Sequence, residues 1–270
     1  MTAVYNLFLK LFLALIFFAL GLLSAFMGWV LLHAPDVHSL NTCIVSSMNQ
    51  VELCDKNDNY VHLPMVPQHL IDALVVNEDS TFFQHSGFDF YEIRQSIKQN
   101  IKRMEYYRGA STLSQQLVKN VFLHQEKDLA RKIKEVYLTY SLEKHFNKKQ
   151  ILEKYLNVVE FGPDIYGLKA AANYYFDKAP IDLNVLESAY LVYLLPNPKG
   201  HSQSFHKKQL SKHAKKRIQL TLRRLLKYRK ITEAKYMVAS SHINEFPWRG
   251  VSLNIIHQIQ DIYSEDEESL

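Results

Sequence analysis

The chain has 270 residues, of which 47% are hydrophobic, and its formal net charge is +5. This length and composition suffice for one sizeable folded domain with appendages, and they argue against general disorder. Glycine and proline are scarce at 8 each and no short repeat is visible, which excludes collagen-like, low-complexity and solenoid architectures.

The N-terminus holds a long apolar run. Residues 11–32 read LFLALIFFALGLLSAFMGWVLL and carry no charge, and about 20 such residues span a bilayer as a helix. A cleaved signal peptide is the alternative, but its apolar core usually has about 7 to 15 residues and no small-residue cleavage site follows here. We therefore expect a cytoplasmic stub and transmembrane anchor at residues 1–35. Lys10 precedes the run and Asp36 follows it, so the positive-inside rule places the rest of the chain outside the cytoplasm.

An irregular lead-in with few periodic signals is expected at residues 36–67. Its two cysteines, Cys43 and Cys54, both follow the apolar run. They can form a disulfide if that side of the membrane is oxidising, and two free buried thiols are the open alternative. The absence of a second ligand pair in the sequence argues against a zinc site.

From residue 68 to 200 the hydrophobic pattern is dominantly helical. Ile93, Ile97 and Ile101 recur every four residues in FYEIRQSIKQNIKRM, which is typical of an amphipathic helix. Further helices are expected at residues 71–78, 113–123, 128–146, 148–161 and 183–195, with breaks near Gly162 and Pro196. No series of alternating strands is visible, so the sequence predicts a mainly α-helical domain.

Residues 199–230 form an unusually basic segment. They hold twelve Lys or Arg and no Asp or Glu, so the rest of the chain is net negative. The pattern HAKKRIQLTLRRLLKYRK predicts an amphipathic helix with a basic face. A solvated face, an anionic membrane surface and nucleic acid are the three interpretations, and nucleic acid is disfavoured because no recognition motif is present. We expect a basic helical extension at 201–250 and a flexible acidic tail at 251–270.

The segment VVNEDSTFFQHSGFD, residues 75–89, is the first stretch that can carry chemistry. Taken alone, Glu78 and Asp79 are an ordinary surface pair. The aromatic residues that follow change this interpretation, because apolar surroundings raise the pKa of a carboxyl toward a value useful for proton transfer. A metal site built from Glu78, Asp79, His85 and Asp89 is the weaker alternative, since no second histidine stands at helical spacing.

The second stretch reads RGASTLSQQLVKN. Thr112 and Gln115 have the spacing of a capping box, which predicts a helix start. The N-terminal end of that helix, beside Ser111, suits an anion such as phosphate. Gln115, Gln116 and Lys119 then share one helix face, where two amides and an ammonium can hold a sugar or a phosphate. An ordinary polar helix face is the alternative.

The third stretch reads RKIKEVYLTYSLEK and places Arg131 one helical turn before Glu135. An ordinary salt bridge between residues i and i+4 is one interpretation. The other is a second carboxylate that a cation holds toward a reaction site. A fourth stretch, residues 151–176, carries small residues that allow close helix packing, and we interpret it as scaffold.

The residues of these stretches, and their order along the chain, resemble the motifs of the family 51 glycosyltransferases, the peptidoglycan polymerases of bacteria. The first family motif, E-D-x-x-F-x-x-H-x-G-x-D, is matched by Glu78, Asp79, Phe82, His85, Gly87 and Asp89. GASTLSQQLVKN resembles the second motif, with Ala110 where a second glycine is usual, and RKIKEVYLTYSLE resembles the third. Residues 148–176 and 183–200 resemble the fourth and fifth motifs, so the likeness covers residues 70–200 in order.

This resemblance implies a mainly α-helical, lysozyme-like, two-lobed glycosyltransferase domain at residues 68–200, behind an N-terminal transmembrane helix. It also implies a single-pass protein of the bacterial cytoplasmic (inner) membrane, with the catalytic domain on the periplasmic or outer side. The implied substrates are lipid II and a growing glycan on undecaprenyl pyrophosphate, joined by a β-1,4 bond with inversion. The residues after position 200 are too few for a penicillin-binding transpeptidase domain, so we expect a monofunctional transglycosylase.

The resemblance also assigns roles to the motif residues. Glu78 would be the general base for the acceptor hydroxyl, and Glu135 would be the second carboxylate, on the side of the leaving pyrophosphate. Lys119 and Arg131 would neutralise the pyrophosphate, and a divalent metal ion, Mg²⁺ or Mn²⁺, is an open addition. The other expected substrate-binding residues are Asp79, Phe82, His85, Ser111, Thr112, Gln115 and Gln116.

Two further functions stay open. A lytic glycosidase on the same glycan would share the fold, but it would leave the helix of two amides and a lysine unexplained. A membrane-tethered scaffold with a degenerate transferase domain would bind anionic lipid or other cell-wall synthesis proteins through the basic segment. The intact Glu78 and Glu135 argue against the scaffold. No nucleic-acid partner is expected.

Overall fold

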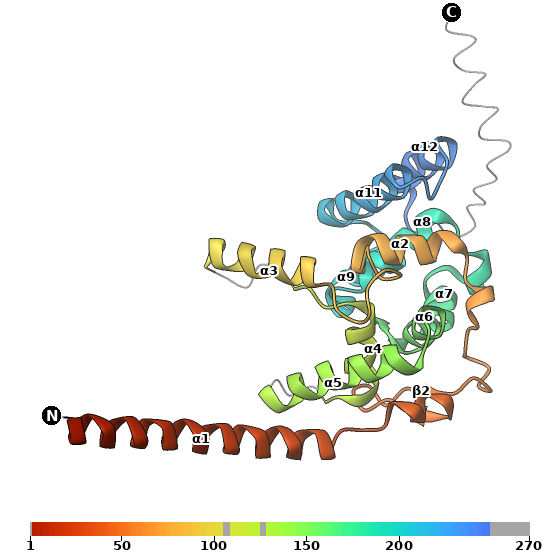
Figure 1. Ribbon diagram of the computed structural model, residues 1–270. Helices are drawn as coiled ribbons and strands as arrows, with labels where there is room; N and C mark the ends of the chain where they lie inside the picture. Colours follow the sequence, from red (N-terminus) through yellow and green to blue (C-terminus); the bar gives the residue numbers. More distant parts are fainter. Residues whose placement is uncertain (1, 105–108, 125–127, 249–270) are drawn as a thin grey trace, which may run out of the picture.

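The computed structural model describes residues 2–104, 109–124 and 128–248. Most of these residues form α-helices, which confirms the predicted mainly α-helical class. Figure 1 shows helix α1 (Thr2–Leu32) as a long rod that leaves the body of the protein, and α3 (Phe90–Arg103) as a second helix that projects toward the same side. The predicted acidic tail at 251–270 lies outside the described residues.

Helix α1 contains the predicted membrane-spanning segment. Among the described residues it is the one helix long and apolar enough to cross a membrane, although a signal sequence passes the same test. Large apolar side chains such as Leu15, Phe17 and Leu22 are exposed along it. Only its last turn meets the body, where Val30 is fully buried and α1 packs against α5.

The body contains two groups of packed helices (Figure 1). In the first group, α8 packs against α2 and α11, and α12 packs against α11. In the second group, α4 packs against α5 and α6. The bounds are α2 Gln68–Glu78, α4 Leu113–Phe122, α5 Leu129–His145, α6 Lys148–Val158, α8 Val185–Leu194, α11 Lys212–Lys227 and α12 Glu233–Ser241. Side chains from both groups, including Leu74, Leu117 and Leu191, form one continuous hydrophobic core.

Several short elements connect these helices. Two antiparallel hairpins pair β1 (Ile44–Val45) with β2 (Glu52–Leu53) and β3 (Glu160–Gly162) with β4 (Ile165–Tyr166). The sequence did not predict them, because strands of two or three residues are too short to show alternation. The remaining short helices are α7 (Leu168–Phe176), α9 (Pro198–His201) and α10 (Gln203–His206).

The lead-in segment is attached to α6 by side-chain hydrogen bonds. The amide of Asn157 accepts from the Val61 backbone N–H at 2.7 Å and donates to the Val61 carbonyl at 2.9 Å. The carboxylate of Glu153 accepts from the Tyr60 hydroxyl at 2.8 Å and from the Leu63 backbone N–H at 2.7 Å. These bonds satisfy buried polar groups and fix the segment between α1 and α2.

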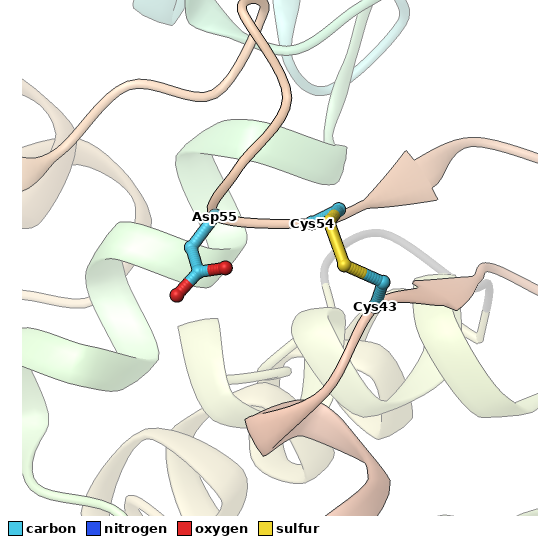
Figure 2. Close-up of side chains that lie close together, drawn as sticks. All are labelled: Cys43, Cys54 and Asp55. Atoms are coloured by element: carbon cyan, nitrogen blue, oxygen red, sulfur yellow. A yellow bond between two sulfur atoms is a disulfide. The ribbon is translucent and has the colours of Figure 1, made fainter.

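A disulfide joins Cys43 and Cys54 beside the first hairpin, with the two Cα atoms 4.2 Å apart (Figure 2). The structure thus decides between the two interpretations that the sequence left open. Cys43, Cys54 and Asp55 are also the one group with metal-ligand spacing among the described residues. Because the two sulfur atoms are bonded to each other, the group does not supply thiolate ligands.

Removing the disulfide should destabilise the protein. We expect the double substitution Cys43→Ser, Cys54→Ser to lower the free energy of unfolding by about 2–4 kcal/mol, because the bond restricts the unfolded chain. Thermal unfolding of the full-length protein in detergent measures the effect. Reductant should lower the Tm of the wild type and leave that of the double variant unchanged. Two reactive thiols in the untreated wild-type protein would show that the bond is absent.

Candidate active site

Helix α4 lies between the two carboxylates that the motifs singled out. Glu78 is the last residue of α2, and Glu135 lies in α5. The Nε2 atom of Gln116 donates to Oε2 of Glu78 at 3.3 Å. The Nε2 atom of Gln115 donates to Oε1 of Glu135, also at 3.3 Å. Two neighbouring amides of one helix therefore connect to two different acidic side chains.

The first turn of α4 is fixed by a dense set of hydrogen bonds. Thr112 caps the helix, and the capping box with Gln115 that the sequence predicted is present. The Thr112 hydroxyl donates to the carbonyl of Gly87 at 2.7 Å. The Asp79 carboxylate accepts from the backbone N–H of Leu113 at 3.0 Å. These contacts tie α4 to the segment that follows Glu78, and they set the relative positions of the two carboxylates.

The first motif supplies the support for this arrangement. The ring of His85 accepts from the Gly87 backbone N–H through Nδ1, so its Nε2–H donates to Asp79, at 2.9 Å. Gly87 has φ +93°, and an added Cβ would lie 3.0 Å from a methyl carbon of Thr139. Phe82 is fully buried in the core. Asp79, Phe82 and His85 thus hold the local structure, and their predicted contact with substrate stays a prediction.

Glu78 has the properties of a proton acceptor. Burial raises the pKa of its carboxyl above the ordinary value, whereas the Gln116 hydrogen bond and the Arg217 charge lower it and the Asp79 charge raises it. Glu78 also lines a cavity of about 210 Å³, together with residues that include Tyr193 and Pro196. A ligand in this cavity can therefore reach a carboxylate whose proton affinity is enhanced.

Tyr155 orients the amide that contacts Glu78. Its hydroxyl, in α6, donates to Oε1 of Gln116 at 3.0 Å, so the amide presents its N–H group to Glu78. Tyr155 is fully buried, and burial raises the pKa of its hydroxyl well above the ordinary value. No pattern in the sequence predicts this role, because a tyrosine at a buried helical position more often belongs to the hydrophobic core.

Glu135 has a different environment. It is buried at 4% exposure. The Lys132 ammonium lies 2.5 Å from Oε1 of its carboxylate. Nη1 of Arg131 lies 3.5 Å from Oε2 of the same carboxylate, which confirms the predicted pairing of Arg131 with Glu135. The Nε atom of Arg131 is buried and has no hydrogen-bond partner among the described residues. The arrangement is therefore a cationic cluster that contains one buried donor without a partner among the described residues.

The other two predicted site residues, Ser111 and Lys119, lie before and within α4. Ser111 is exposed, directly before the cap of α4, and Lys119 is exposed near the end of that helix. The sequence missed the contribution of the basic segment. Arg217 and Thr221 of α11 line the cavity beside Glu78. The periodicity of the segment predicted its helix, but it could not predict which helix would lie against it.

The residues around Glu135 can be compared with the ligands that the predicted divalent metal ion would need. Mg²⁺ and Mn²⁺ prefer several oxygen ligands, often more than one carboxylate. The site around Glu135 offers one carboxylate, that of Glu135 itself. This carboxylate is already contacted by an amide N–H and two cationic side chains. These residues fit a divalent metal ion poorly.

The substitution Glu78→Gln should stabilise the protein in a pH-dependent way. The folded-state pKa of Glu78 lies above the unfolded value, so the folded state holds this proton more tightly, and stability is lost as pH rises through that range. We expect Glu78→Gln to raise Tm by a few degrees at pH 7.5, with a smaller gain at acidic pH. Glu233→Gln on α12 is the control and should give no such gain. A lower Tm for Glu78→Gln at pH 7.5 would contradict the assignment.

Comparison with known proteins places the chain in a family. Residues 46–226 match the family described as Transglycosylase. A biosynthetic peptidoglycan transglycosylase of Nitrosomonas eutropha is 34% identical over 209 residues, covering 74% of this chain and 85% of that protein. One of Acinetobacter baylyi is 42% identical over 132 residues, covering 49% and 59%. Penicillin-binding protein 1A of Aquifex aeolicus is 38% identical over 177 residues, covering 66% and 24%. The chain therefore belongs to the transglycosylase family, and the prediction of a peptidoglycan glycosyltransferase is confirmed.

Proposed function

We propose that this transglycosylase polymerises lipid II into glycan strands. The donor is a glycan on undecaprenyl pyrophosphate, and the acceptor is lipid II. The observation that supports this assignment best is Glu78, a carboxyl with a raised pKa that lines a cavity and is held by the oriented amide of Gln116. A base with a pKa near the working pH is the most effective proton acceptor for a sugar hydroxyl.

Glu78 takes the proton of the acceptor 4-hydroxyl as that oxygen attacks C1 of the donor sugar. The new O4–C1 bond forms while the bond from C1 to the pyrophosphate oxygen breaks. A single displacement inverts the configuration at C1 and gives a β-1,4 bond, and undecaprenyl pyrophosphate leaves. Two carboxylates on separate sides of a helix suit such a displacement, in which the base and the leaving group lie on opposite faces of the sugar.

The cationic cluster around Glu135 stabilises the leaving group. Arg131 and Lys132 are paired with Glu135, and the Arg131 side chain, which is 19% exposed, can also donate to a pyrophosphate oxygen. Lys119 adds a further positive charge on α4. Charges held in place before the reaction stabilise a developing anion without reorganisation. Glu135 therefore acts by positioning Arg131, and not as a base.

Both substrates carry lipid, so the enzyme works at a membrane. We place α1 across the bacterial cytoplasmic membrane, with the catalytic domain on the outer side, where the disulfide is stable. Helix α3 projects from the body and exposes large apolar side chains, among them Phe90 at 77% and Ile101 at 71%. Exposed apolar surface of this kind marks contact with lipid or with a partner, such as another cell-wall synthesis protein.

A lytic glycosidase is the second candidate, because a raised pKa also suits a general acid. The contacts around Glu135 favour the transferase. A hydrolase that cuts a neutral sugar bond has no anionic leaving group, and Arg131 and Lys132 would then have no ligand to stabilise.

Incubation of labelled lipid II with the full-length protein in detergent separates these functions. We expect glycan ladders from the wild type, a loss of about 10²–10⁴-fold in rate for Glu78→Gln, and a smaller loss for Glu135→Gln, which leaves Arg131 in place. Glu233→Gln controls for the loss of a carboxylate elsewhere and should polymerise normally. Shortening of added glycan would indicate the glycosidase. No reaction by a folded wild-type protein would indicate the scaffold.

A further inference from the structure

A second cavity adjoins the one that contains Glu78. It measures about 520 Å³, within the range of small-ligand sites. It lies among α9, α10 and the start of α11, and it shares the walls Tyr193, His201 and His213 with the Glu78 cavity. The two cavities are therefore neighbours, and one extended ligand can occupy both.

The lining of this second cavity is cationic and rich in hydrogen-bonding groups. It includes Lys207 and Lys212, and no Asp or Glu belongs to it. Neither lysine makes a side-chain hydrogen bond or an ion pair with any other residue that the structure describes. The polar groups of the lining also include the amides of Gln203 and Gln209 and the hydroxyls of Ser204 and Ser211.

One wall of the cavity is rigid. Nδ1 of His201 lies 2.8 Å from the carbonyl of Tyr193, and the two rings stack with their centroids 4.3 Å apart. Tyr193 belongs to α8, which is buried along its whole length. The cavity is thus formed on a fixed surface, and the two exposed lysines are the charged part of its lining.

The place of the cavity indicates which substrate reaches it. In the proposed function the sugar at Glu78 belongs to the acceptor, and the leaving pyrophosphate lies at Arg131 and Glu135, across α4. The second cavity shares its walls with the Glu78 cavity, whereas neither Arg131 nor Glu135 lines it. The second cavity therefore lies on the acceptor side of the site. Groups attached to the acceptor sugar at Glu78 can extend into it.

Lipid II, the acceptor in the proposed function, is a lipid-linked disaccharide that carries a short peptide with free carboxylates. We propose that this cavity binds the peptide of the acceptor. The inference rests on the proposed function. A peptide offers carboxylates to the two lysines, and it offers N–H and C=O groups to the amides and hydroxyls of the lining. A pyrophosphate offers only acceptor oxygens, which would leave the acceptor atoms of Gln203 and Gln209 unmatched. The site selects acceptors whose peptide is acidic.

The test compares two substrates and two matched double variants of the full-length protein. The substrates are lipid II with free peptide carboxylates and lipid II with those carboxylates amidated. The variants are Lys207→Gln, Lys212→Gln in the cavity, and Lys208→Gln, Lys216→Gln at neighbouring exposed positions outside it. Both variants lose the same charge, and thermal unfolding checks their fold.

For the wild type and the control variant we expect KM for the amidated substrate to exceed KM for the acidic one by about 3–10-fold, the net effect of about one hydrogen bond at an exposed site. In the cavity variant this ratio should fall toward one. An equal rise of both KM values in the cavity variant would overturn the proposal, because it would point to the shared pyrophosphate. A ratio of one in the wild type would overturn it as well.

Binding of the soluble, lipid-free disaccharide peptide tests the cavity independently of catalysis. We expect the wild type to bind the acidic form more tightly than the amidated form, and the cavity variant to lose this difference. If the wild type polymerises no lipid II but binds with this pattern, the proposed function fails and the peptide site stands. Equal binding of both forms by the wild type would overturn the peptide site alone.

Discussion

The position of the first turn of α4 is the constraint on which the site depends. The Asp79 carboxylate holds the Leu113 backbone N–H, and the capping hydroxyl of Thr112 holds the segment that follows α2. A buried helix end needs such partners, because its first N–H groups have none within the helix. Once this turn is fixed, the amides of Gln115 and Gln116 lie against two carboxylates from different helices.

This geometry gives two glutamates different chemistry. Glu78 lies beside a cavity, receives one oriented amide, and has a pKa that burial raises. Glu135 is buried against two cations, Arg131 and Lys132. One environment favours proton uptake, and the other favours an anionic leaving group. The separation of two carboxylates by environment is a general way for a fold to supply both a base and an electrostatic stabiliser at one pH.

Local patterns in the sequence predicted the parts of the structure that depend on neighbouring residues. These include the main helices, the capping box at Thr112 and the pairing of Arg131 with Glu135. The motifs also identified the family. The sequence could not predict contacts between distant segments, such as the hydrogen bond from Tyr155 to Gln116 or the place of Arg217 beside Glu78. Those contacts depend on helix packing, which residue spacing alone does not specify.

The pH dependence of lipid II polymerisation by the wild type and Tyr155→Phe tests the central claim, that an oriented amide on α4 tunes Glu78 as the base. We expect an acid limb of kcat/KM above the ordinary carboxyl range. The limb should shift to higher pH in Tyr155→Phe, because the amide of Gln116, whose hydrogen bond lowers the pKa of Glu78, then loses its orientation. Tyr190→Phe is the control, since that buried hydroxyl has no partner among the described residues. Identical pH profiles of kcat/KM for the wild type and Tyr155→Phe would show that the oriented amide of Gln116 does not tune Glu78.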